Sequence, residues 1–365
     1  MLRRVVIAGG GTGGHLFPGI ALAQALMKHD PDIEITFVGT RTGLEARVLP
    51  REGFRLKTIS AAGLIGQRGR RRILSWLKLP WAGLQAFVFL LRYRPRLVVG
   101  VGGYVSGPVV AAATTLGIPT LIHEQNALPG VTNRLLGTRV DRIAVSFEES
   151  LACFPKHLTT VTGNLIRPAF AQAPEPRPRD PAAPLQVLVL GGSQGAHSIN
   201  RALVAALPAL KVVQDRVRLV HQTGQADAAW VAEAYQKLGW EAEVLPFIYD
   251  MEQRYREADL VICRAGATTL AELTACGKAS VLIPYPFAAH QHQEKNARVL
   301  EAAEAAVVIS NDALSGEKIA QVIRDALEHP EVWDARARAA YGLGRRDATE
   351  RVKQMCLELM QRQAA

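Results

Sequence analysis

The sequence has few cysteines and no long apolar run. Its four cysteines, at positions 153, 263, 276 and 356, have neither CxxC spacing nor Cys/His ligand spacing, so we expect free thiols in a reducing compartment. No run reaches the roughly 18 apolar residues that a membrane-spanning helix needs. The charged start at Met1 to Arg4 is followed by only four apolar residues, too few for the core of a signal peptide. The chain is therefore expected to remain in the cytosol.

Acidic residues are also missing from one long stretch, and this absence makes the charge uneven. The 365 residues carry a net charge of +10, yet no Asp or Glu occurs from Gly53 to His123. The basic residues of that stretch are Arg55, Lys57, Arg68, Arg70, Arg71, Arg72, Lys78, Arg92, Arg94 and Arg96. Large apolar residues stand among them, namely Leu64, Ile65, Ile73, Leu74, Trp76, Leu77, Leu79, Trp81, Phe87 and Phe89.

Basic side chains beside large apolar ones are typical of a surface that binds an anionic membrane. Nucleic acid is the rival partner, but the sequence contains no recognised binding module for it. We expect residues 64–81 to make the membrane contact and residues 84–91 to form mostly a core helix. In the alternative interpretation, the segment is a solvated basic loop followed by a core helix, with no membrane role.

Two glycine loops of the same design stand about half a chain apart. Val5 to Ala8 leads into Gly9 to His15, and Val187 to Leu190 leads into Gly191 to His197. A buried parallel strand that turns tightly into a helix directs backbone amides and the helix dipole at one point, which suits a diphosphate. The sequence therefore predicts an α/β protein of two Rossmann-like, doubly wound parallel-sheet domains facing each other across a cleft.

Apolar runs and helical patterns alternate along both halves, as in doubly wound sheets. The expected strands are Arg4–Ala8, Glu34–Val38, Leu56–Ile59, Leu97–Val101, Thr120–His123, Arg142–Val145, Gln186–Leu190, Arg218–His221, Ala242–Pro246, Leu260–Cys263, Ser280–Ile283 and Ala306–Ile309. The proline-rich stretch 171–184 is the expected junction between the domains. We assign residues 1–165 to an N-terminal domain and residues 166–344 to a C-terminal domain. A charged C-terminal helix within 345–365 is expected to pack back on the first domain.

The first loop matches the dinucleotide pattern GxGxxG, but the residue that would complete that site is missing. Dehydrogenases place an acid at the end of the second strand to hold the ribose. Here that strand ends in Gly39-Thr40-Arg41, and Glu34 stands at its other end. The equivalent strand in the second half leads into Gln222-Thr223-Gly224, again without an acid. A nicotinamide or flavin enzyme is therefore disfavoured, and no cofactor is expected.

Ligands of open α/β sheets lie beyond the carboxyl ends of the strands, so the residues there are the candidate site. They are mostly amides, hydroxyls and glycines, which suit a sugar and a diphosphate better than a metal. Three features also have a purely structural interpretation. Gly102-Gly103 can be a plain turn, and Asp30-Pro31-Asp32 can be a proline turn instead of a metal motif. His290 and His292 can be unrelated side chains instead of metal ligands. His15 either caps the helix or takes part in catalysis, and its place favours catalysis.

Four motifs together resemble the MurG family of bacterial glycosyltransferases. They are Gly10 to Gly19, His123-Glu124-Gln125-Asn126, Gly191 to Ala196, and Arg264 to Glu272. The resemblance implies a B-type fold and an inverting, metal-independent enzyme. It also implies transfer of N-acetylglucosamine from UDP-N-acetylglucosamine to the 4-hydroxyl of the muramoyl sugar of lipid I, forming lipid II. Such an enzyme would be peripheral, on the cytoplasmic face of the inner membrane.

The resemblance implies that residues 1–165 bind the acceptor and the membrane and that residues 166–344 bind the UDP-sugar. It also implies the site residues. The donor sugar and diphosphate contacts would be Thr12, Gly13, Gly14, Asn126, Arg167 and Ser193. The nucleoside contacts would be Ile248, Ala267, Thr268, Thr269, Leu270, Ala271 and Glu272, with Glu272 on the ribose, and Gln293 would meet sugar hydroxyls. The chain departs from the family pattern at Tyr249, where an acid often stands, and at His292, where a second glutamine can occur.

The expected chemistry needs a base for the acceptor hydroxyl and a positive environment for departing UDP. His15 is the predicted base and Glu124 the second candidate. Arg167, backbone amides and helix dipoles would stabilise the leaving group. Two other classes stay open: a UDP-N-acetylglucosamine 2-epimerase, and a non-catalytic protein that binds the sugar nucleotide.

Overall fold

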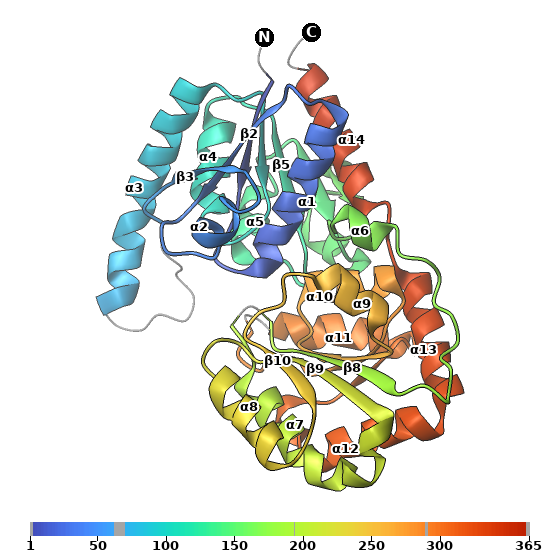
Figure 1. The fold of residues 1–365 in the computed structure, drawn as a ribbon. Coiled ribbons are helices and arrows are strands. Elements are labelled where there is room, and N and C mark those ends of the chain that lie inside the picture. Colours follow the sequence, from blue (N-terminus) through green and yellow to red (C-terminus); the bar gives the residue numbers. More distant parts are fainter. Residues whose placement is uncertain (1–2, 62–69, 193, 289–290, 363–365) are drawn as a thin grey trace. The chain divides into compact units, whose positions relative to one another are not determined.

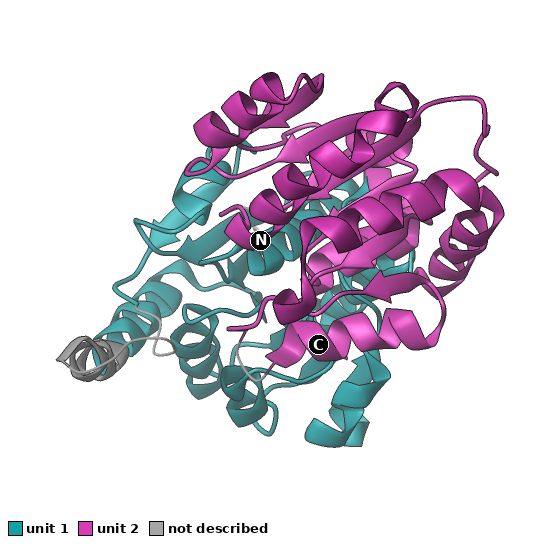
Figure 2. Cartoon of the chain, turned by 90° about the horizontal axis from the view of Figure 1, so that it is seen from below, with its two compact units in different colours: residues 1–168, 345–365 teal, residues 169–344 magenta. Residues whose placement is uncertain are grey.

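The structure is a computed structural model that describes residues 3–61, 70–192, 194–288 and 291–362, with only the backbone of 70–79. Two compact units divide the chain (Figure 2). Unit 1 consists of the residues up to Pro168 together with those from Arg345 onward, and unit 2 is Ala169–Gly344. The chain thus returns to its first unit after completing the second.

Unit 1 is built on a seven-stranded parallel sheet in the order β3-β2-β1-β4-β5-β6-β7 (Figure 1). Strands β1, β4 and β5 lie at its centre and are entirely or almost entirely buried, as expected of a parallel sheet covered on both faces. The strands are β1 Arg4–Ala8, β2 Glu34–Gly39, β3 Arg55–Thr58, β4 Leu97–Gly100, β5 Thr120–Glu124, β6 Arg142–Val145 and β7 Thr159–Val161.

Helices cover the two faces of this sheet because successive strand side chains point to opposite sides. Val5 and Ile7 belong to a core shared with α1 and the C-terminal helix α14, whereas Val6 and Ala8 belong to a core shared with α3 and α4. The helices of unit 1 are α1 Gly13–His29, α2 Glu45–Val48, α3 Arg70–Tyr93, α4 Ser106–Thr115, α5 Val131–Leu136 and α14 Ala348–Arg362, with α6 Pro168–Ala171 at the boundary.

Unit 2 repeats the architecture with a six-stranded parallel sheet in the order β10-β9-β8-β11-β12-β13. Its strands are β8 Leu185–Leu190, β9 Val217–Gln222, β10 Ala242–Leu245, β11 Leu260–Cys263, β12 Ala279–Leu282 and β13 Ala306–Val308. Its helices are α7 His197–Leu210, α8 Ala228–Lys237, α9 Met251–Glu257, α10 Ala267–Cys276, α11 His292–Ala302, α12 Gly316–Glu328 and α13 Pro330–Leu343.

The predicted fold class, two doubly wound parallel sheets, is confirmed. Each expected strand is present with its ends shifted by at most one residue. The sequence analysis missed β7, which is only three residues long and lies at the sheet edge.

The proline-rich stretch 171–184 was expected to be the junction, but it lies within unit 2. Arg179 fastens it there. Its amide donates to both carboxylate oxygens of Asp334 at 3.3 Å, and its side chain, only 7% exposed, stands 3.7 Å from Asp259. The stretch is therefore tied to the body of unit 2, and the boundary precedes it.

The segment 84–91 of α3 was predicted to be mostly core, and half of that prediction is wrong. Ala82, Ala86 and Leu90 are buried against the sheet. The opposite face carries large apolar side chains that are well exposed, Trp81 at 55%, Leu84 at 51%, Val88 at 37% and Leu91 at 52%. Because both faces of α3 carry apolar residues, the sequence did not indicate which face packs against the sheet. No helix among the described residues is long and apolar enough to cross a membrane.

Candidate active site

Three neighbouring strands of unit 1 carry the predicted residues of this unit at one edge of the sheet. Strand β1 ends in the first glycine loop, β4 ends in Gly102-Gly103, and β5 ends in Glu124. The loops are closely packed, because a side chain on Gly103 would lie 2.5 Å from the carbonyl oxygen of Gly10. Gly103 also has a φ of +80°, which only glycine adopts without strain. Gly102-Gly103 is thus a turn, and one that supports the first glycine loop.

A buried carboxylate that the sequence analysis missed, Glu45, organises that loop. One of its oxygens accepts a hydrogen bond from the Gly11 amide at 2.9 Å. The other accepts from the amide and the hydroxyl of Thr40, both at 2.8 Å. Side chains on Gly10 or Gly43 would overlap the carboxyl group, and one on Gly39 would overlap Cγ of Glu45. The Glu45 carboxylate therefore accepts from this glycine loop in the way that a bound phosphate does in other glycine loops.

His15 stands in the first turn of α1 and is half-buried. Its Nδ1 atom is buried and faces the backbone of Gly102, where a Cβ atom would lie only 2.6 Å away. Gly102 has a φ of +93°. The absence of a side chain at this position leaves room for the imidazole ring, so β4 and α1 together determine where the ring lies.

Behind His15, two buried polar side chains follow strand β5. His123 is fully buried, and its Nε2 atom lies 3.2 Å from the carbonyl oxygen of Gly163. The amide nitrogen of Gln125 donates to the Val101 carbonyl at 2.7 Å and lies 3.1 Å from Nδ1 of His123. Burial lowers the pKa of His123 to about 4, against the opposing effect of the Gly163 bond and with a smaller contribution from His15. His123 is therefore neutral at physiological pH.

Glu124 is 2% exposed and holds the loop that follows β5. One oxygen accepts from the amide and the side chain of Asn126, at 3.0 and 3.1 Å. The other accepts from the Gly130 amide at 3.0 Å and from Asn133 at 2.9 Å. Four donors thus surround the carboxylate, an arrangement typical of a structural acid that positions Asn126.

Arg167 belongs to unit 1, although it lies next to the boundary. Its guanidinium stands over the ring of Phe17, one turn into α1, at 5.6 Å. The preceding residue, Ile166, is fastened by the C-terminal helix: Thr349 Oγ1 accepts from its amide at 3.1 Å and donates to its carbonyl at 2.8 Å. Helix α14 therefore takes part in placing Arg167.

In unit 2, the second glycine loop follows β8 and packs on backbone. A side chain on Gly195 would lie 2.1 Å from the Thr223 carbonyl oxygen, and one on Gly224 would collide with Gly195 in turn. Both glycines have a positive φ, +79° and +81°. The predicted ligand Ser193 lies outside the described residues, as does His290, the candidate metal ligand. The loop is thus held by β9 and its following turn.

The predicted nucleoside segment forms the start of α10, directly after β11. Of its residues, Ala267, Thr268 and Leu270 are buried, and Thr269, Ala271 and Glu272 are partly exposed. Arg264 holds this end of the sheet, because its guanidinium donates to the carbonyls of Ile283 and Pro284 at 3.1 Å. It also donates to Ser198 at 2.8 Å, at the start of α7.

The remaining predicted residues of unit 2 differ in exposure. Ile248 is 3% exposed and Tyr249 is 68% exposed. The side-chain oxygen of Gln293, at the start of α11, accepts from the Tyr285 amide at 2.9 Å. Its amide nitrogen is therefore the part of Gln293 that is suited to donate to a sugar hydroxyl.

Asp30 and Asp32 lie in the turn between α1 and β2, at the edge of the sheet where the strands begin. Asp30 accepts from Arg3 at 2.9 Å and from the Asp32 amide at 3.2 Å, as in an ordinary polar turn. In the part of the chain that the structure describes, no three His, Cys, Asp or Glu side chains are grouped as metal ligands.

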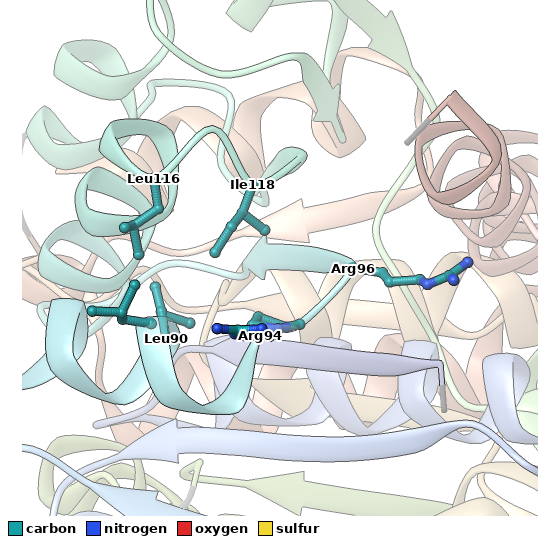
Figure 3. A pocket seen from close by; sticks show the side chains of 7 residues that line it. Leu90, Arg94, Arg96, Leu116 and Ile118 are labelled. Carbon is teal, nitrogen blue, oxygen red and sulfur yellow. The ribbon is translucent and has the colours of Figure 1, made fainter. Parts of the chain in front are cut away.

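Two open cavities lie at the same edge where strands begin, away from the glycine loops. One, of about 390 Å³, is lined by Leu90, Leu91, Arg94, Pro95, Arg96, Leu116 and Ile118 (Figure 3). The other, of about 510 Å³, lies beside the start of β2 and β3. Neither contains a predicted site residue. The structure thus gathers Thr12, Gly13, Gly14, His15, Glu124, Asn126 and Arg167 in unit 1, and the other described candidates in unit 2.

Replacing Glu45 by Gln tests whether this carboxylate holds the first loop. An amide group keeps the shape but turns an NH2 group toward a backbone donor, so we expect the free energy of unfolding to fall by about 1–3 kcal/mol. Glu52→Gln, at an exposed position in the same segment, is the matched control. The measurement is urea unfolding followed by circular dichroism, and equal midpoints for both variants would contradict the assignment.

Comparison with known proteins agrees with this architecture. Residues 5–145 match the glycosyltransferase family 28 N-terminal domain, and residues 186–352 match the family 28 C-terminal domain. Among solved structures, Acinetobacter baumannii MurG is similar with a TM-score of 0.75 and 32% identity, over 98% of this chain and 99% of that one. A UDP-GlcNAc 2-epimerase from Neisseria meningitidis, bound to UDP-GlcNAc, covers 97% of this chain at a TM-score of 0.69. Its 13% identity shows a shared fold only.

Relatives of known name are similar over nearly their whole length. The UDP-N-acetylglucosamine–N-acetylmuramyl-(pentapeptide) pyrophosphoryl-undecaprenol N-acetylglucosamine transferase of Geobacter sp. (strain M21) is 47% identical over 349 residues, 96% of this chain and 94% of the relative. The enzyme of the same name from Myxococcus xanthus is 46% identical over 359 residues, 98% of this chain and 94% of the relative. The chain therefore belongs to glycosyltransferase family 28 and, within it, to the MurG family.

Proposed function

We propose that this enzyme transfers N-acetylglucosamine from UDP-N-acetylglucosamine to the 4-hydroxyl of the muramoyl sugar of lipid I, forming lipid II with inversion at the anomeric carbon and without a metal. The observation that carries the proposal is identity of 46–47% to transferases of that name over nearly the full chain. The polar, glycine-rich strand ends of both units support it, because they supply amides and hydroxyls for a sugar and a diphosphate.

The donor nucleotide is assigned to unit 2. Ile248, Glu272 and the start of α10 would hold the nucleoside, and Ser193 with the second glycine loop would hold the diphosphate. Gln293 would donate to a sugar hydroxyl through its amide nitrogen. Thr12, Gly13, Gly14, Asn126 and Arg167 would contribute from unit 1. Glu45 supports this division, since its carboxylate takes the Gly11 amide in the first loop, whereas the second loop packs on backbone.

In the proposed reaction, His15 takes the proton of the acceptor hydroxyl as its oxygen bonds to the anomeric carbon of the donor. The bond from that carbon to the diphosphate breaks, and UDP leaves with the electron pair. Arg167 and the loop amides would stabilise its charge. The four donors around Glu124 leave it poorly suited to take a proton, which favours His15 as the base.

The reaction is tested by incubating the protein with UDP-N-acetylglucosamine, with and without a lipid I analogue, in excess EDTA. We expect UDP and the disaccharide product only when the acceptor is present. Formation of a UDP-sugar epimer without acceptor would indicate a 2-epimerase, and binding without turnover would indicate a non-catalytic protein. Activity lost in EDTA and restored by magnesium or manganese would overturn the metal-independent mechanism.

Replacement of His15 by Ala should lower kcat by about 100- to 10,000-fold, the usual cost of removing a general base. The KM for the donor should change much less, since the base acts in the transition state. His29→Ala, at the exposed far end of the same helix, is the control and should turn over normally. A His15→Ala variant as fast as this control would mean that another group is the base.

We also propose that unit 1 binds the anionic cytoplasmic face of the inner membrane, where a polyprenyl-linked acceptor is held. The exposed face of α3, formed by Trp81, Leu84, Val88 and Leu91, supports this. Exposed Arg92 and Arg94 flank it, and the cavity of Figure 3 adjoins it through Leu91. Leu64 and Ile65, expected to take part, lie outside the described residues, as does the side chain of Trp76.

Charge and apolar area should contribute separately to vesicle binding. Replacing Arg92 and Arg94 by Gln should weaken binding to anionic vesicles at low salt, by about 1 kcal/mol per charge, and the loss should vanish at high salt. Replacing Trp81 and Leu84 by Ser should weaken binding at both salt concentrations. Val212→Ser, at an exposed apolar position of unit 2, is the control. Co-sedimentation equal to the parent's in both variants would contradict membrane binding by this face.

A further inference from the structure

We infer that Gln125 is a positioning residue for His15: its side-chain oxygen accepts a hydrogen bond from Nδ1–H of His15 and leaves Nε2 to accept the proton of the substrate. The inference rests on the proposed function, in which His15 is the base. It extends that function by naming the group that selects the reactive form of the imidazole.

The carbonyl oxygen of Gly163 determines the tautomer of His123. Nε2 of His123 lies 3.2 Å from the Gly163 carbonyl oxygen. A carbonyl oxygen can only accept, so Nε2 carries the hydrogen. Because burial keeps the ring neutral, with a pKa of about 4, Nδ1 has no hydrogen and is an acceptor.

Two acceptors determine the orientation of the Gln125 amide. Both of its partners, Nδ1 of His123 and the Val101 carbonyl oxygen, are acceptors, and they lie 3.1 and 2.7 Å from the amide nitrogen. The NH2 group must therefore point at them, since the alternative orientation would oppose lone pairs at both contacts. The side-chain oxygen then points away. It is buried, and no donor bonds to it among the described residues.

The Gln125 oxygen and His15 lie beside the same glycine, Gly102. The point where a side chain of Gly102 would begin lies 2.6 Å from His15 Nδ1 and 3.3 Å from the Gln125 oxygen. Both atoms therefore border the space that Gly102 leaves open. Catalytic hydrogen bonds are often long in unliganded enzymes and shorten when the substrate binds. The inferred hydrogen bond requires the imidazole ring to turn toward Gln125 until Nδ1 and the oxygen are within hydrogen-bond distance.

The consequence is chemical selectivity. A neutral imidazole has one donor and one acceptor nitrogen, and a hydrogen bond at one nitrogen decides the role of the other. An acceptor at Nδ1 keeps the hydrogen there, so the lone pair is on Nε2, at the edge of the ring away from Gly102. After proton transfer, the same oxygen stabilises the imidazolium, and neutral His123 adds no opposing charge.

The test is nitrogen NMR of the full-length protein with 15N-labelled histidine, at about pH 8, where imidazoles are mostly neutral. The His15 signals are identified by their loss in His15→Ala. We expect the hydrogen of His15 on Nδ1 in the parent. In Gln125→Met we expect a shift toward the Nε2–H tautomer. Hydrogen on Nε2 in the parent, or an unchanged tautomer in a folded Gln125→Met variant, would overturn the inference.

Kinetics provide a second readout. Gln125→Met should lower kcat by about 10- to 100-fold, as the loss of a partner that orients a metal-ligating histidine does, with little change in donor KM. Gln24→Met, on a partly exposed position of α1, is the matched control. A Met variant as fast as this control would count against the inference.

The two proposals fail in different ways. If His15→Ala is fully active while the parent has the hydrogen on Nδ1, the assigned base is wrong and the hydrogen bond is structural. If His15→Ala is inactive while the parent has the hydrogen on Nε2, the base stands and Gln125 does not select its tautomer.

Discussion

The buried carboxylate of Glu45 is the constraint on which the catalytic edge of unit 1 depends. A carboxylate withdrawn from water needs donors for both oxygens, and here they come from Gly11 and Thr40. The donors belong to the turns after β1 and β2, so the acid joins the two turns. Glycines at positions 10, 39 and 43 leave room for this side chain, because a Cβ atom at any of them would overlap the carboxyl group or Cγ of Glu45. Two loops of the same sequence design thus differ: the first has an internal anion, whereas the described residues of the second pack on backbone.

The neighbouring turn extends this constraint to the reactive groups. Gly103 packs on the Gly10 carbonyl, and Gly102 lies against the His15 ring. The backbone of α1 and of the turn after β4 therefore determines where the His15 ring lies, and the side-chain oxygen of Gln125, after β5, borders the same space. The turns that form this site pack closely on one another, which suits a reaction whose base and leaving-group contacts must be preorganised.

The fold could be predicted from sequence because buried strands that end in glycine loops are local patterns. The site was predicted only in part. Glu45 was missed since its partners are mainly backbone amides, which leave no trace in the sequence. Thr349 was missed since it meets Ile166 from 183 positions away. The exposed side of α3 was assigned to the core because apolar residues such as Ala86 and Leu84 alternate on its two faces. The proline-rich stretch was assigned to the junction because the contacts by which Arg179 ties it to unit 2 cannot be seen in the sequence.

The return of α14 to unit 1 bears on the chemistry as well as on the fold. Val352, Cys356 and Leu359 complete the core beside α1, and Thr349, on the same helix, fastens Ile166 through both of its backbone groups. Arg167 follows directly and stands over Phe17 of α1. The charge proposed to meet the departing diphosphate therefore belongs to the same compact unit as His15, and α14 and α1 together determine where it lies.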